Sequence, residues 1–210
     1  MYKLKVVSLG PGSPDYILPV AQKAIAAAQV ILCGARHLES FDVTGKEVYR
    51  IGPDGKLTEL MAKIADIYQH KPTAIVVSGD CGFYSLLTYT QKVIPKADIE
   101  AIPGISSLQY LFAKIGKTWQ DAGMMSLHGR EQDLIAQVRA HPVVGTLTDN
   151  THNTAWIAER LIEAGLSDKT LYVGEDLSYP EERITRLTVE EGRAFAESGM
   201  AVVVIVDDEH

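Results

Sequence analysis

The feature that most restricts the fold of this chain is the alternation of short β-branched segments with longer stretches of helical periodicity. Leu57, Leu60, Met61, Ile64 and Ile67, for example, recur at the spacing that places apolar side chains along one face of a helix. Such alternation is typical of mostly parallel sheets with helices packed against them. The sequence predicts strands at residues 4–9, 30–33, 73–78, 99–102, 124–127, 143–148, 170–174, 183–187 and 201–206, and helices at residues 20–28, 57–68, 85–93, 106–115, 132–140, 154–164 and 189–197.

The alternation changes in the second half of the chain, where residues 170–187 have the pattern of a hairpin. We therefore expect some antiparallel pairing there. A boundary is predicted near Gly116, just after the last helix of the first half. The sequence thus indicates an α/β protein with an N-terminal α/β lobe at residues 1–116 and a C-terminal α/β lobe at residues 117–210.

Composition and charge exclude several classes of protein. The net charge of −7, with no run of basic residues, disfavours nucleic-acid binding because an acidic surface repels phosphates. The N-terminus enters a predicted strand at once, without the pattern of a signal peptide, and the longest apolar run, residues 200–206, is too short to span a bilayer. Cys33 and Cys81 have no metal-binding spacing and suit a reducing compartment. We expect a cytoplasmic protein with no nucleic-acid or membrane partner and no metal site.

The first predicted strand ends in a tight turn, Gly10-Pro11-Gly12. Glycines at the carboxyl end of a strand allow the backbone to approach a ligand closely. The turn is not a dinucleotide-binding fingerprint, because the third glycine and the later acidic residue of that motif are missing. An ordinary strand-to-helix connection would have the same pattern, so this turn alone leaves both interpretations open.

Two further glycine turns follow predicted strands. In residues 78–85, Asp80 can accept hydrogen bonds and Phe83 and Tyr84 offer an apolar wall; alternatively, Asp80 caps a helix that begins near Tyr84. In residues 102–107, Ser106 can cap the next helix or, with Ser107, bind a carboxylate or an amine. Three such turns would line one crevice, because open α/β sheets bind ligands at the carboxyl ends of their strands.

Taken in order, residues 10–12, 79–85 and 103–107 resemble the signatures of the tetrapyrrole (class III) methyltransferases. The resemblance covers nearly the whole chain. Residues 34–38 and 126–130 are similar to the branch of that family that methylates ring carbon 5 of cobalt-precorrin-6B, which gives cobalt-precorrin-7 in cobalamin (vitamin B12) biosynthesis. The resemblance implies two α/β lobes, a mostly parallel sheet in the first and a mixed sheet in the second, with the cofactor in the cleft between them, and a homodimer.

The implied cofactor is S-adenosyl-L-methionine, which leaves as S-adenosyl-L-homocysteine. The sequence departs from many relatives at Cys81, where they have proline; a neutral thiol fits that turn. Carried over by motif, the cofactor-binding residues are Pro11, Ser78, Gly79, Asp80, Phe83, Ser106, Ser107, Thr148 and Leu177.

The implied substrate carries many carboxylates, so an acidic protein must gather positive charge locally to bind it. Candidates for substrate binding are Arg36, His37, His128 and Arg130, with Arg183 as a further possibility. His128 and Arg130 could instead be surface residues, or caps of a helix that begins near Glu131. The sequence identifies no catalytic residue, because the sulfonium methyl is already activated and the main task is to position the accepting carbon.

Several alternatives remain open at this stage. The substrate could be a metal-free precorrin, or the chain could methylate diphthamide or ribosomal RNA, although the acidic charge argues against RNA. It could also be a non-catalytic module that binds a tetrapyrrole or nucleotide. Some relatives carry a second methyltransferase that acts at C15 with decarboxylation; we expect that activity to come from a separate partner here.

Overall fold

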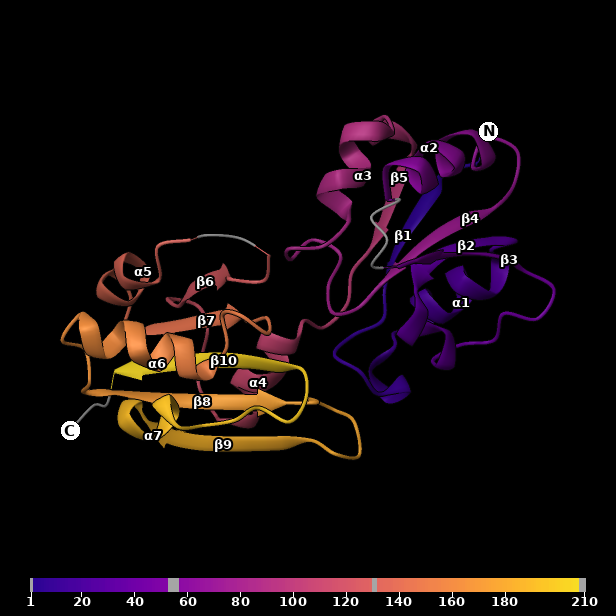
Figure 1. The fold of residues 1–210 in the computed structure, drawn as a ribbon. Helices are drawn as coiled ribbons and strands as arrows, with labels where there is room; N and C mark the ends of the chain where they lie inside the picture. Colours follow the sequence, from indigo (N-terminus) through magenta and orange to yellow (C-terminus); the bar gives the residue numbers. More distant parts are fainter. Residues whose placement is uncertain (1, 53–56, 130–131, 208–210) are drawn as a thin grey trace. The chain divides into compact units, whose positions relative to one another are not determined.

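The computed structural model describes residues 2–52, 57–129 and 132–207, which form two compact units that divide between Ser106 and Ser107 (Figure 1). The boundary expected from the sequence lies near Gly116, about ten residues later. The structure assigns helix α4 (Ser107–Lys114) to the second unit, because that helix packs against the second sheet. Among the described residues, no helix is long and apolar enough to cross a membrane.

The first unit is built on a five-stranded parallel sheet with the strand order β3-β2-β4-β1-β5. Because every strand runs the same way, the carboxyl ends of all five meet at one edge, and the loops that follow them are neighbours. The strands are β1 (Leu4–Ser8), β2 (Val30–Gly34), β3 (Glu47–Ile51), β4 (Thr73–Val77) and β5 (Ile99–Ile102).

Helices cover both faces of this sheet, since successive side chains of its central strands point to opposite sides. Val7 and Ile31 pack with Ile25 of helix α1 (Pro19–Ala27) on one face. Val6 and Leu32 pack with Met61 of helix α2 on the other. Figure 1 shows α1 on one side of the sheet and α2 and α3 on the other. The remaining elements of this unit are α2 (Leu57–Ile67), α3 (Leu87–Val93) and the short 3-10 helices η1 (Pro14–Tyr16), η2 (Ala35–Glu39) and η3 (Lys96–Asp98).

The second unit has a mixed sheet with the order β6-β7-β10-β8-β9, in which β6 and β7 are parallel and the other pairs are antiparallel. The expected hairpin is the pair β8–β9. Helices α5, α6 and α7 contribute to one buried cluster on this sheet. On β7, Gly145 lies against Phe112 and Leu108 of α4, so the absence of a side chain at Gly145 lets that helix approach. The elements are β6 (Gly123–Ser126), β7 (Val143–Leu147), β8 (Lys169–Glu175), β9 (Arg183–Thr188), β10 (Ala201–Asp207), α5 (Leu134–Ala140), α6 (Thr154–Glu163) and α7 (Val189–Arg193).

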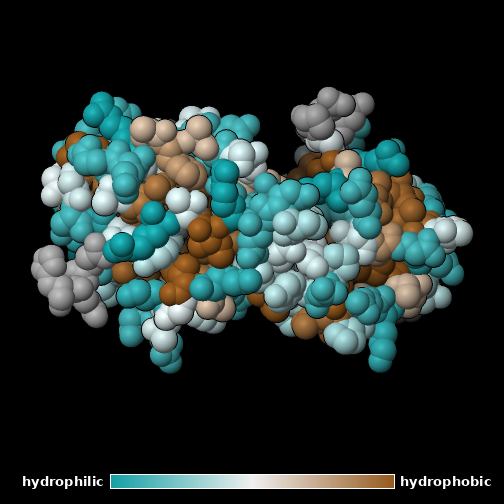
Figure 2. Space-filling model, turned by 90° about the horizontal axis from the view of Figure 1, so that it is seen from below, coloured by the Kyte–Doolittle hydropathy of each residue, from teal (hydrophilic) through white to brown (hydrophobic). Residues whose placement is uncertain are grey.

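These observations confirm the expected fold class, with one parallel and one mixed sheet. One strand, β3, was not predicted. On the face shown in Figure 2, hydrophilic residues lie between the apolar patches. Among the residues that the structure describes, the large apolar side chains that are exposed are those of Tyr2, Val20, Val93, Trp119 and Met200.

Candidate functional site

The three glycine turns of the first unit lie side by side, because they follow the adjacent strands β4, β1 and β5. Gly10 and Gly79 exchange two backbone hydrogen bonds, with N–O distances of 3.1 and 2.7 Å. Both glycines have positive φ, +80° and +65°, a conformation that other residues rarely adopt. The sequence therefore requires glycine at the point where the first turn joins the second.

The third turn approaches the other two closely at Gly104. A Cβ built there would lie 2.5 Å from Ser8 Cβ and 2.6 Å from the Gly79 carbonyl oxygen. Only glycine fits between those atoms without displacing the backbone of a neighbouring turn.

Asp80 connects the second turn to the third through its carboxylate. Oδ2 accepts a hydrogen bond of 2.9 Å from Gly82 N–H within its own turn, and Oδ1 accepts one of 2.9 Å from Gly104 N–H. The alternative role as a helix cap is wrong, because α3 begins at Leu87 and has no side-chain cap. Since a carboxylate can accept about four hydrogen bonds, Asp80 retains capacity for a ligand donor.

A buried hydroxyl, that of Ser8 at the end of β1, completes the connections. Its Oγ accepts a hydrogen bond of 2.8 Å from the Cys81 N–H and donates one of 2.8 Å to the Ile102 carbonyl oxygen. A proline at position 81 would have no N–H to give, so Ser8 and Cys81 act as a pair. Burial raises the pKa of the Cys81 thiol, which agrees with a neutral thiol at this position. Ser8 is not among the residues predicted from the sequence, although a serine at the end of an apolar strand is a signal that could have indicated it.

The apolar wall of the second turn consists of the half-buried Phe83 and Tyr84, whose rings meet edge to face with centroids 4.8 Å apart. Tyr84 has φ +47°. Among the described residues, only three non-glycines have positive φ, and strain of this kind concentrates at ligand sites. The other two, Asp176 and Ser178, flank Leu177 in the second unit.

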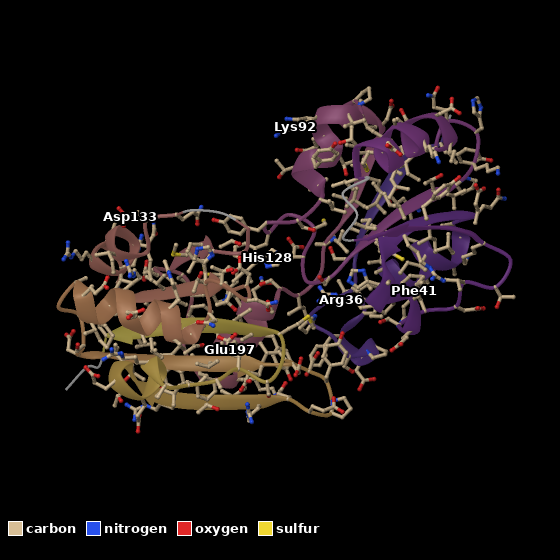
Figure 3. The ribbon with its side chains drawn as sticks, viewed as in Figure 1. Arg36, Phe41, Lys92, His128, Asp133 and Glu197 are labelled. Carbon is tan, nitrogen blue, oxygen red and sulfur yellow. The ribbon has the colours of Figure 1, made fainter. Side chains whose placement is uncertain are left out.

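Two predicted substrate-binding residues lie at the same edge of the first unit, on η2 directly after β2. Figure 3 labels the first of them, Arg36. Its Nη2 donates a hydrogen bond of 2.9 Å to the Ser78 hydroxyl, and its Nε donates one of 3.3 Å to Nε2 of His37. Arg36 is exposed, so it presents positive charge to solvent beside the second turn. Burial and the charge of Arg36 lower the pKa of His37 to about 4, so His37 is neutral at pH 7 and adds no positive charge.

Pro11 and Ser106 complete the set in the first unit. Pro11 is half-buried between the two glycines of the first turn. Ser106 is 4% exposed. It lies next to the second turn, because a Cβ added at Gly79 would be 3.6 Å from the Cα of Ser106. The predicted residues Pro11, Ser78, Gly79, Asp80, Phe83 and Ser106, with Arg36 and His37, are therefore all found at the carboxyl edge of one sheet.

In the second unit, Thr148 and Leu177 follow the parallel-running strands β7 and β8 and lie at one edge of the mixed sheet. The Thr148 hydroxyl donates a hydrogen bond of 2.7 Å to the carbonyl oxygen of Ala201, the first residue of β10. The Leu177 side chain is buried over Gly174, so only its backbone is available to a ligand. Ser107 is the first residue of α4.

The turn after β8 is held by an ion pair between the buried Glu175 and the exposed Arg183. Glu175, 1% exposed, accepts hydrogen bonds of 2.8 and 2.9 Å from Nε and Nη2 of Arg183, and another of 2.7 Å from Ser198 N–H. Arg183, a candidate for substrate binding from the sequence, is thus paired with a structural partner.

His128 follows β6 at the same edge, and its Nδ1 lies 3.2 Å from the Thr148 carbonyl oxygen. The next residue, Gly129, donates its N–H to Oδ2 of Asp149 at 2.8 Å. His128 does not cap a helix, because the residue that caps α5 is Asp133 and the helix begins at Leu134. Arg130 lies outside the described residues.

Asp149 organises the two loops at this edge. Besides Gly129 N–H, its carboxylate accepts hydrogen bonds from Thr151 N–H at 2.9 Å and His152 N–H at 2.7 Å. These backbone donors hold the pKa of Asp149 below its usual value. In the part of the chain that the structure describes, no group of three His, Cys, Asp or Glu side chains could hold a metal ion.

The first-unit edge suits an adenosyl sulfonium cofactor on its own chemistry. It offers polar backbone atoms freed by glycines, a carboxylate for a hydroxyl or ammonium, and an apolar wall of two rings. A nucleotide phosphate would meet the Asp80 carboxylate there, which argues against a phosphate-binding loop.

Comparisons with known proteins agree with this chemistry. Residues 3–192 match the family of Tetrapyrrole (Corrin/Porphyrin) Methylases. The chain is 34% identical over 206 residues to the cobalt-precorrin-7 C(5)-methyltransferase of Salmonella typhimurium, covering 98% of this chain and 99% of that protein. It is 31% identical over 211 residues to the probable cobalt-precorrin-7 C(5)-methyltransferase of Methanocaldococcus jannaschii, covering 97% and 98%. A solved structure of uroporphyrin-III C-methyltransferase from Thermus thermophilus, complexed with S-adenyl homocysteine, has a TM-score of 0.78 at 20% identity and covers 97% of this chain and 92% of that one.

Proposed function

The chain belongs to the tetrapyrrole (corrin/porphyrin) methylases, and from that premise we propose that it transfers a methyl group from S-adenosyl-L-methionine to ring carbon 5 of cobalt-precorrin-6B. The product would be cobalt-precorrin-7, in cobalamin biosynthesis. The observation that carries this proposal is the joined set of three turns at the carboxyl ends of β4, β1 and β5, in a chain similar over nearly its whole length to C(5)-methyltransferases.

The cofactor, when bound, supplies an activated methyl on a sulfonium centre. The residues of the first unit proposed to hold it are Pro11, Ser78, Gly79, Asp80, Phe83 and Ser106. Asp80 would accept a hydrogen bond from a hydroxyl or ammonium group, and Phe83 would pack against an apolar part. In the second unit, Ser107, Thr148 and Leu177 are the proposed contacts, Leu177 through its backbone because its side chain is buried.

The substrate proposal rests on the charge at the same edges. Arg36 is exposed beside the second turn and can bind a carboxylate, while the neutral His37 can serve only as a hydrogen-bonding ring. His128 is exposed in the second unit, and Arg130 remains a sequence-based candidate. Positioning of the accepting carbon and exclusion of water would provide most of the rate enhancement.

The cellular setting follows from the same resemblance. We propose a cytoplasmic homodimer that works beside a separate enzyme responsible for methylation at C15 with decarboxylation. Gel filtration with light scattering distinguishes a dimer of about twice 22.9 kDa from a monomer.

The test uses the purified protein with labelled S-adenosyl-L-methionine and a panel of acceptors: cobalt-precorrin-6B, its metal-free counterpart, and diphthamide and ribosomal-RNA substrates. We expect a single methyl to be added to cobalt-precorrin-6B. Tight binding of S-adenosyl-L-homocysteine without transfer to any acceptor would mean a binding module, and transfer only to a non-tetrapyrrole would overturn the substrate assignment.

A further inference from the structure

The side chain of His128 is fixed by the loops around it, although it is exposed to solvent. Its backbone N–H donates to the Ser126 hydroxyl at 3.3 Å, and its ring nitrogen Nδ1 contacts the Thr148 carbonyl at 3.2 Å. The following residue is held by the Asp149 carboxylate. Ser126 is itself held in place, because its backbone N–H donates a hydrogen bond of 3.1 Å to Oε1 of Gln132. The ring therefore has a defined place at the edge of the second sheet (Figure 3).

The Thr148 carbonyl determines where the ring carries its proton. A carbonyl oxygen only accepts hydrogen bonds, so Nδ1 must be the donor in this contact. In the neutral ring the other nitrogen, Nε2, then has a lone pair. Among residues 2–52, 57–129 and 132–207, none forms a hydrogen bond with Nε2. The structure thus presents a histidine with one nitrogen anchored and the other available as a proton acceptor.

The proposed reaction needs such an acceptor. When a neutral ring carbon uses an electron pair to form a bond to the methyl group, the bond from methyl to sulfur breaks and sulfur keeps its pair. The substrate has then gained one positive charge, and it returns to its former charge when one proton leaves. Positioned bases that take up such a proton contribute about 100-fold or more to the rates of enzymes.

We propose that His128 is the catalytic base of the methyl transfer, accepting the departing substrate proton at Nε2 while Nδ1–H stays bonded to the Thr148 carbonyl. The proton then passes to water, since the side chain is exposed. This inference rests on the proposed function and deepens it, because it assigns a chemical step to a residue considered above only for substrate binding. Two ionisable neighbours, Asp149 and His152, belong to the same pair of loops, and Asp149 holds the backbone N–H groups of Gly129 and His152.

The first experiment observes the ring without any catalysis. Long-range ¹H–¹⁵N correlation spectra of histidine-labelled protein, assigned with the variant His128→Ala, report which nitrogen carries the proton. We expect the neutral ring of His128 to have the proton on Nδ1. A proton on Nε2 would overturn the proposal, because no lone pair would then be available at that position.

The second experiment measures single-turnover methyl transfer at saturating S-adenosyl-L-methionine. We expect His128→Ala to lower the maximal rate about 100-fold with little change in the substrate concentration at half-maximal rate. Added imidazole should restore at least a tenth of the lost rate. The control is His70→Ala, which removes an exposed histidine from the turn before β4, at the opposite edge of the first sheet, and should react at the wild-type rate without a response to imidazole.

The outcomes separate the inference from the proposed function. If the wild-type protein transfers no methyl group, the proposed function has failed. If it does, and His128→Ala retains the full rate, or loses rate only through weaker substrate binding without rescue by imidazole, then His128 is a binding residue and the inference is wrong.

Discussion

At the scale of single residues, the candidate site depends on atoms that join one turn to another. Ser8, Asp80 and Gly104 each contact more than one turn, so each influences the shape of the whole edge as well as its own loop. The substitutions that report most clearly on the site are therefore those that break one such connection.

Asp80→Ala should weaken S-adenosyl-L-homocysteine binding by about 10- to 100-fold, because it removes an acceptor proposed for the cofactor and frees the Gly104 N–H. It should also lower the free energy of unfolding by about 1–3 kcal/mol, since two backbone donors lose their partner. Calorimetric titration and urea unfolding measure the two effects. Lower stability with unchanged affinity would reduce Asp80 to a structural residue.

Gly104→Ala should lower the free energy of unfolding by about 1–3 kcal/mol or more, because the added Cβ would lie 2.5 Å from Cβ of Ser8 in β1 and 2.6 Å from the Gly79 carbonyl oxygen of the second turn. The matched control is Gly52→Ala, where a Cβ would meet no atom of the described residues within 4 Å. Urea unfolding of both variants provides the comparison. Equal stability of the two would show that the three turns are not packed as closely as described.

At the scale of elements, the ends of strands decide where functional residues lie, and two of those ends are held by buried or partly buried carboxylates. Glu175 fixes the end of β8 through Arg183 and Ser198. Asp149 fixes the loops after β6 and β7 through three backbone N–H groups. The two carboxylates lead to different predictions, because Glu175 is paired with the charged Arg183 across the hairpin β8–β9, whereas Asp149 accepts hydrogen bonds from three backbone N–H groups.

Arg183→Met should lower the free energy of unfolding by about 1–3 kcal/mol, because it leaves the buried Glu175 carboxylate without its cation, while solvent at the half-exposed Arg183 position screens part of the lost attraction. Adding Glu175→Gln should recover part of that loss by removing the unpaired charge. Lys71→Met, which breaks the exposed pair with Glu47, is the control and should change stability little. Additive losses in the double variant would contradict the pairing.

Asp149→Asn should make stability less dependent on pH in the acid range. The folded-state pKa of Asp149 lies below its unfolded value, so the stability it contributes is complete above about pH 4 and is lost as the pH falls further. The difference in unfolding free energy between wild type and variant should therefore be largest near pH 7 and shrink toward pH 2. If the difference in unfolding free energy stays constant from pH 7 to pH 2, the three backbone donors do not stabilise the ionised form of Asp149.

The sequence predicted most elements of this fold, and the exceptions have physical reasons. Strand β3 was missed because it is an edge strand in which the exposed Glu47 and Arg50 flank only half-buried side chains. Helix α3 begins at Leu87, two positions later than predicted, since Tyr84 before it adopts a left-handed conformation.

The site was predictable as a set of turns but not as a set of contacts. Glycines after apolar strands indicated which loops could bind a cofactor, and the resemblance to the family indicated which residues of those loops would contact it. The bond from Asp80 to Gly104 could not be predicted, because it depends on β1 lying between β4 and β5 in the sheet. The neutral state of His37 likewise depends on burial and on the position of Arg36.

At the scale of the whole molecule, the chain combines one parallel and one mixed sheet, each with loops that carry candidate residues at one edge. Membership of the tetrapyrrole methylases and 34% identity to a C(5)-methyltransferase over 98% of the chain point to one reaction. That reaction is defined by the ring carbon of the product that carries the new methyl group.

The most direct test incubates the protein with cobalt-precorrin-6B and S-adenosyl-L-methionine labelled with ¹³C in its methyl group, and locates the label in the product by NMR. We predict one labelled methyl per tetrapyrrole, on ring carbon 5. A label on another ring carbon, or an unlabelled tetrapyrrole under conditions in which S-adenosyl-L-homocysteine binds, would contradict the account.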